Sequence, residues 1–202
     1  MIYGILALVF GIWCWMRLFT RYPERSIRDV YPFFYYIEGE ILIGSFHPEP
    51  EQAYRTANTS TEFRKWQIRR VHLAIHLCRH ISANCHLLQE WTTYERKLNW
   101  EAHSEPVRVG LREFQVRCMR ARTAAFAIRF RLLLWLMRMH MLPMLPVPSF
   151  RSLVDHSNRL IESYGAAETL VETLSLLYGE EIHENMVAVL GMVELESDEP
   201  EG

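Results

Sequence analysis

The chain has 202 residues, of which 50% are hydrophobic and 12% aromatic, and its formal net charge is −2. This length suits one domain with a real core and excludes two full domains, and the composition is too apolar for a disordered chain. The charge is unevenly distributed. Residues 1–150 hold 20 basic and 12 acidic side chains, whereas residues 151–202 hold 2 basic and 12 acidic ones. The two parts of the chain therefore carry net charges of opposite sign.

Residues 1–20 are predicted to form a single membrane anchor helix. The apolar run has no charged side chain before Arg17, and a helix from Ile2 to Phe19 would be about 27 Å long, enough to span a bilayer. A cleaved signal peptide fits less well, because no basic residue precedes the run; a helix packed on the membrane or on the core is the other alternative. The residues expected at the membrane interface are Trp13, Trp15, Arg17 and Arg21.

The orientation of this anchor follows from its flanks. Arg17, Arg21, Arg25 and Arg28 follow the apolar run, and only the initiating amine precedes it. Because positively charged flanks stay in the cytosol, we expect a single-pass membrane protein with the bulk of the chain in the cytosol.

Residues 21–58 are predicted to be an irregular juxtamembrane segment, since they contain four prolines and two glycines among many aromatic side chains. Aromatic and β-branched residues between positions 33 and 46 favour strands, whereas the helical context favours short helices. Both interpretations remain open.

Residues 59–193 are predicted to form a helical bundle domain. Thr59 and Glu62 have the spacing of a capping box, and no glycine or proline then occurs before Pro106. This pattern indicates one long helix from Ser60 to Leu98.

A second long helix is expected from Ser104, its cap, to Leu142, and the prolines within residues 143–148 end it. Three shorter helices are expected at Ser149–Tyr164, Ala166–Tyr178 and Glu180–Glu194. Gly165 and Gly179 separate them, and residues 194–202 form an acidic disordered tail. The predicted fold is thus all-α: a membrane-anchored helical bundle with two long antiparallel helices and about three shorter C-terminal ones.

Four cysteines are present, at positions 14, 78, 85 and 118, without any C-x-x-C pair. Cys78 and Cys85 fall within the first long helix, where seven residues separate them by roughly 10 Å along the axis. This separation exceeds the Cα–Cα distance of a disulfide. We therefore expect free thiols, which are typical of a reducing compartment.

The histidine-rich stretch of the first long helix is the best local candidate for a metal site. Its histidines recur every fourth residue on the rim of the buried stripe, but His72 and His80 are about 12 Å apart, so at most two neighbours can share one ion. Glu180 and His183 have the spacing of a di-iron ligand pair, yet that chemistry needs a second such motif. The sequence therefore predicts no metal, no cofactor and no catalytic residue. Its remaining metal candidates are His72, His76, His80 and His183.

Eight arginines lie on the second long helix, with one acidic residue, Glu113, inside it. Apolar side chains alternate with the arginines, whereas a helix that binds nucleic acid exposes a largely polar face, so no nucleic acid is expected. Insertion of this helix as a second membrane span is energetically unfavourable. Arg129, Arg131 and Arg138 would each cost about 2.5–3.5 kcal/mol near the bilayer centre, while each Leu, Ile or Phe returns about 0.3–0.6 kcal/mol. These three arginines are predicted to pair with other elements or to reach an anionic membrane surface.

The helices after Ser149 are acidic, so we expect them to fold back antiparallel on the basic helix. No P-loop, dinucleotide-binding fingerprint or nucleophile elbow is present in the sequence. We therefore expect an interaction or scaffold module on the membrane, with a protein partner that the sequence does not identify. The alternative is a metal- or cofactor-binding bundle enzyme that uses the histidine-rich helix, with Cys78, Cys85 and His183.

Overall fold

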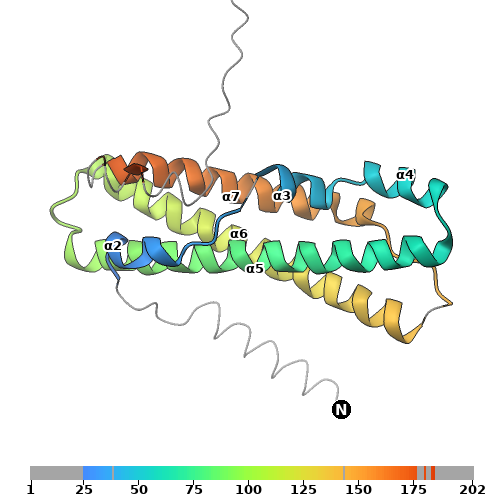
Figure 1. The fold of residues 1–202 in the computed structure, drawn as a ribbon. Coiled ribbons are helices and arrows are strands. Elements are labelled where there is room, and N and C mark those ends of the chain that lie inside the picture. Colours follow the sequence, from blue (N-terminus) through green and yellow to red (C-terminus); the bar gives the residue numbers. More distant parts are fainter. Residues whose placement is uncertain (1–24, 38, 143, 177–179, 181–182, 185–202) are drawn as a thin grey trace, which may run out of the picture.

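The computed structural model describes residues 25–37, 39–142, 144–176, 180, 183 and 184. All regular elements in these ranges are helices, so the predicted all-α fold is confirmed for this part of the chain (Figure 1). In chain order they are α2 (Ile27–Val30), η1 (Tyr31–Phe33), α3 (Gly39–Phe46), α4 (Glu49–Ala57), α5 (Ser60–Leu98), α6 (Glu105–Met141), η2 (Phe150–Leu153) and α7 (Val154–Ser175).

Helix α5 has the bounds that its sequence predicts, because its start is specified locally. The Thr59 hydroxyl accepts the Glu62 N–H, and the Glu62 carboxylate accepts the Thr59 N–H at 3.1 Å, which completes the capping box. A cap of this kind stabilises a helix by about 1 kcal/mol. The helix ends at Leu98, before a turn that leads into α6.

Helix α6 lies antiparallel to α5, as the short connection requires. Pro106 occupies its first turn, where a missing N–H costs nothing, and the helix ends at Met141, shortly before the proline-rich turn. The two helices meet through fully buried aromatic side chains, with the Trp91 ring edge-on to Phe114 at 5.7 Å between centroids. Edge-to-face contact of this kind is favourable beyond the apolar area that it buries.

Helix α7 corrects one prediction, because it runs through Gly165 without a break. The sequence predicts two helices divided at this glycine, since glycine costs about 1 kcal/mol inside a helix. However, Leu160, Tyr164, Ala167 and Val171 form one continuous buried stripe with helical spacing across it. Burial of this stripe outweighs the local penalty at Gly165.

The segment before α5 resolves the alternative between strand and helix in favour of helices. Residues 39–46 form α3, in which Leu42 and Phe46, four residues apart, are both buried in the core. Ile27, Val30 and other apolar residues of this segment belong to the same core cluster. The segment is therefore an integral part of the bundle rather than a linker.

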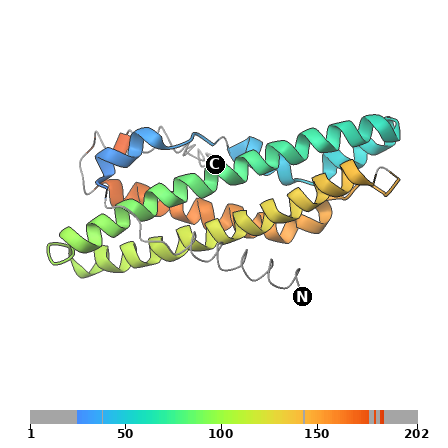
Figure 2. The ribbon, with the colours of Figure 1, turned by 90° about the horizontal axis from the view of Figure 1, so that it is seen from below.

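In cross-section the bundle has four corners. Both α6 and α3 pack against α5 and α7, and Figure 2 shows α6 on the opposite side of α5 from the short helices α2 and α3. The exposed faces of α6 and of the short helices therefore point in opposite directions.

Helix α7 folds back antiparallel on α6, as the sequence predicts. Apolar packing joins this part of the chain to α6: the Trp135 ring lies edge-on to Phe150 of η2 at 5.6 Å between centroids, and Leu174 of α7 lies against Gly110. Arg117 of α6 pairs with Glu113 of the same helix at 3.0 Å.

Among the described helices, none is long and apolar enough to cross a membrane. The predicted anchor, with Trp13, Trp15, Arg17 and Arg21, lies outside the described residues. So do the acidic tail and most of the predicted helix Glu180–Glu194.

Candidate functional site

The predicted metal candidates on α5 do not assemble into a metal site. The His76 and His80 rings lie 4.1 Å apart between centroids, and the His80 ring also stacks on the Tyr35 ring at 4.2 Å between centroids. Burial, and then the nearby charges of His76 and Arg79, lower the pKa of His80. His72 is exposed on the surface. In the described ranges no group of three or more His, Cys, Asp or Glu side chains converges as metal ligands would.

The fourth metal candidate, His183, contacts the end of α7. Its Nδ1 lies 2.9 Å from the hydroxyl oxygen of Ser175, a buried residue of the last turn. In an uninterrupted helix, eight residues would separate these positions by about 12 Å. Helix α7 therefore does not continue unbroken to His183.

The thiols of α5 and α6 are buried and unreactive. Cys78, Cys85 and Cys118 are free and fully buried, as expected for small core residues. Burial raises the pKa of Cys78 to about 12. Burial and a hydrogen bond with Cys85 also raise the pKa of Cys118. Since the thiolate is the reactive form, the thiols of Cys78 and Cys118 are not nucleophiles near neutral pH.

A buried polar cluster joins the N-terminal segment to α5 and α7. The Asn84 side chain accepts the Tyr35 N–H and donates to the Tyr35 carbonyl, both at 2.8 Å, and it donates to the Tyr164 hydroxyl at 2.9 Å. Glu168 lies one helical turn after Tyr164 on α7. Burial raises the pKa of its carboxyl group to about 7, although a hydrogen bond from Tyr164 acts in the opposite direction. The cluster fixes three elements together. No sequence pattern around Asn84 predicts it.

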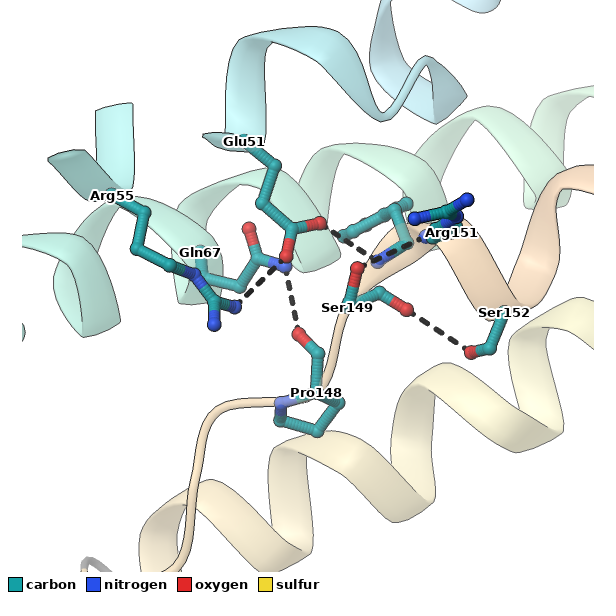
Figure 3. Close-up of polar contacts among 8 residues, drawn as sticks. Glu51, Arg55, Gln67, Pro148, Ser149, Arg151 and Ser152 are labelled. Atoms are coloured by element: carbon teal, nitrogen blue, oxygen red, sulfur yellow. Dashed lines mark hydrogen bonds and ion pairs between the residues drawn. The ribbon is translucent and has the colours of Figure 1, made fainter. Parts of the chain in front are cut away.

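A second polar cluster fastens the turn between α6 and α7. The buried Glu51 carboxylate of α4 accepts the Phe150 N–H at 2.9 Å and the Arg55 guanidinium at 3.0 Å (Figure 3). Beside it, Gln67 of α5 donates to the Pro148 carbonyl at 3.0 Å. These contacts end on backbone groups or on a neighbouring side chain of the same helix, so the cluster is structural. No sequence pattern around Glu51 predicts it.

The most unusual surface lies on α6, on the side turned away from the core. Its exposed residues are mostly apolar or arginine, with Glu113 and Thr123 among them, and we call the apolar and arginine residues of this surface the outer face. The outer face consists of Val109, Arg112, Val116, Met119, Arg120, Phe130, Arg131, Leu133, Leu134, Met137, Arg138 and Met141. Met137 is 53% exposed and Met141 71% exposed, and the turn that follows adds Leu142 and Met144. The buried side of α6 is equally apolar, so this helix is apolar on two opposite sides.

The arginines of the outer face have weak partners in the described part of the chain. Arg131 lies 3.4 Å from the His156 imidazole, and Arg138 donates to the Pro146 carbonyl at 3.3 Å. The Arg112 guanidinium lies 5.1 Å from the centre of the Trp100 ring. None of these three acceptors is a carboxylate.

The outer face contains two of the three interface arginines predicted on α6. Arg131 and Arg138 lie on it, whereas Arg129 is half-buried on the side of α6 that faces Cys78 of α5. The sequence did not reveal that the apolar side chains between these arginines are exposed. A helical wheel separates Leu134, Met137 and Met141 from the buried side, but which side faces the core depends on α5 and α7.

Comparisons of this chain with protein-family models, with curated proteins and with solved structures gave no match. The functional interpretation therefore rests on the geometry of the chain itself.

Proposed function

We propose that this chain is a docking module held at a membrane by residues 1–20, and that a protein partner binds the outer face of α6. The observation that carries the proposal is the exposure of large apolar side chains along this helix, among them Phe130, Leu134 and Met137. Contiguous exposed apolar surface is rare on monomeric proteins and typical of binding sites. Arginine and methionine are also enriched at interfaces.

The place of the predicted anchor in the sequence supports an outer face that points away from the membrane, toward the cytosol. Only residues 21–24 separate the predicted anchor from the described bundle, and four extended residues reach about 14 Å at most. A bilayer-spanning anchor would hold the nearby helix α2 close to the membrane. Helix α6 occupies the opposite corner of the bundle, so its outer face would point away from that membrane, toward other proteins.

A metal- or cofactor-binding enzyme was the alternative from the sequence. No observation on the described residues favours it, because the histidines of α5 do not converge with further ligands.

The test is affinity capture from native membranes with the full chain. The double variant Leu134→Glu with Met137→Glu places two charges in the middle of the outer face. Ile43→Glu, at a comparably exposed apolar position on α3, is the matched control. We expect the double variant to lose a set of proteins that the wild type and Ile43→Glu both retain. Identical capture by all three chains would contradict the proposal. Carbonate extraction tests the anchor separately, since an anchored chain stays in the membrane fraction.

A further inference from the structure

We infer that the exposed side of α5 binds an anionic lipid surface through a row of basic side chains, together with the apolar rim of a hollow beside that row. This inference goes beyond the proposed function, because it assigns a second surface and a different class of partner. It does not depend on whether a protein binds the outer face of α6.

The basic side chains of α5 lie in one row on its exposed side. They recur at alternating intervals of four and three residues, and this spacing keeps them on one face of a helix. From Phe63 to Gln89 the helix has no acidic residue. In the described part of the chain, no member of the row forms an ion pair with a carboxylate. The members of this basic row, all exposed, are Lys65, Arg69, His72, His76 and Arg79.

A hollow of about 500 Å³ adjoins the basic row, between α5 and the helices α3 and α4. Arg69 of the row lines it together with Ile41 and Leu73, and both of these apolar side chains are exposed. Farther along α5, the exposed ring of Tyr35 stacks on His80. Apolar and aromatic side chains beside basic ones are typical of surfaces that lie on a membrane. A nucleic-acid site would expose a largely polar face instead.

A buried arginine that lines the same hollow has one unused donor. Arg70 is 8% exposed, its Nε donates to the Ser45 carbonyl at 3.0 Å and its Nη2 donates to the His47 carbonyl. Its Nη1, however, has no hydrogen-bond partner among the residues that the structure describes. A buried donor without an acceptor is unfavourable. A lipid phosphate that enters the hollow beside Arg69 can supply this acceptor, since guanidinium groups bind phosphate strongly.

The described chain begins on the same side of α5. The Arg25 Nε lies 3.7 Å from the Glu90 carboxylate, and position 90 continues the four-and-three spacing of the basic row. The predicted anchor ends only a few residues before Arg25, so a membrane that holds this anchor lies close to one end of the row. Lipid contact here leaves the outer face of α6 accessible, because α6 packs on another side of α5 (Figure 2).

The test is photo-cross-linking of the full chain, purified and reconstituted in vesicles of phosphatidylcholine with or without phosphatidylserine. A diazirine-bearing residue in place of Leu73 lies beside the basic row. The same residue in place of Met119 on α6 is the matched control, since the two side chains are 42% and 41% exposed. Each lysine or arginine near an anionic surface favours binding by about fivefold. We therefore expect phosphatidylserine to raise the yield of lipid adducts from position 73 by roughly tenfold, and to leave the yield from position 119 unchanged.

Charge-removing variants connect this increase to the basic row. The double variant Arg69→Gln with Arg79→Gln should abolish the increase at position 73. Arg120→Gln with Arg131→Gln removes the same charge from exposed positions of α6 and should retain it. All four substitutions change exposed side chains, so the helical circular dichroism spectrum should stay that of the wild type.

Equal lipid adducts from position 73 in the two kinds of vesicle would overturn the inference, as would an increase that the α5 double variant retains. An added single-stranded RNA that binds the wild type but not this variant, and that suppresses the lipid adducts, would assign the row to nucleic acid instead. The proposed function is tested separately, because partner capture depends on Leu134 and Met137 rather than on α5.

Discussion

Substitution of Glu168 by glutamine should make the bundle more stable at alkaline pH and leave it unchanged in acid. The carboxyl group of Glu168 lies in the buried cluster around Tyr164, and burial raises its pKa from 4.5 to about 7. The folded state therefore holds this proton more tightly than the unfolded state does. As the pH rises from 4.5 to 7, the unfolded chain loses the proton first, and the free energy of unfolding falls. A pKa difference of this size corresponds to about 3 kcal/mol.

Glutamine has nearly the same shape and stays neutral, so the loss should disappear. We expect Glu168→Gln to exceed the wild type by up to about 3 kcal/mol in free energy of unfolding at pH 8, and to match it near pH 4. Urea unfolding in detergent, followed by circular dichroism at several pH values, measures this difference. The exposed Glu162→Gln on the same helix serves as the control and should follow the wild-type profile. Parallel pH profiles for Glu168→Gln and the wild type would refute the reasoning.

Three further outcomes follow from the described contacts. Gly165→Ala should raise the free energy of unfolding by roughly 0.5–1 kcal/mol in a urea titration, because this helical position has no atom within 4 Å of the added Cβ; a destabilised variant would contradict the continuous α7. Asn84→Ala removes hydrogen bonds to Tyr35 and Tyr164 and should cost about 2–4 kcal/mol in the same titration, and a loss under 1 kcal/mol would show that water replaces them. Cys78 should react with iodoacetamide at pH 8 only after unfolding, as mass spectrometry of the alkylated peptides would show, because burial raises its pKa to about 12; rapid labelling of the folded chain would contradict its burial.

Elements whose limits are set by neighbouring residues were predictable from the sequence. The capping box at Thr59 determined the start of α5, the absence of glycine and proline allowed its length, and the prolines after Met141 determined the end of α6. The predicted helix break at Gly165 is wrong, because the helix-breaking tendency of glycine is a local effect of about 1 kcal/mol, whereas α7 is held by burial against α6. Local propensity is outweighed by burial in α3 too: its residues favour a strand, but they form a helix that buries two of them in the core.

The candidate site was only half predictable. The sequence indicated that Arg131 and Arg138 belong to an interface, since neither burial nor membrane insertion suited them. It did not indicate the exposed apolar residues between them, because α6 is apolar on two sides and only contacts with α5 and α7 select the buried one. The clusters around Glu51 and Asn84 depend on residues distant in the sequence, so no local pattern could reveal them.

Photo-cross-linking from the outer face in native membranes tests the docking proposal most directly. A photoreactive residue in place of Met137 samples the centre of this face, and the same residue in place of Ile43 samples a similarly exposed position on the opposite corner of the bundle. We predict adducts with a protein partner from position 137, and none of these adducts from position 43. The account would be contradicted if position 137 gave lipid adducts alone, no adducts, or the same adducts as position 43.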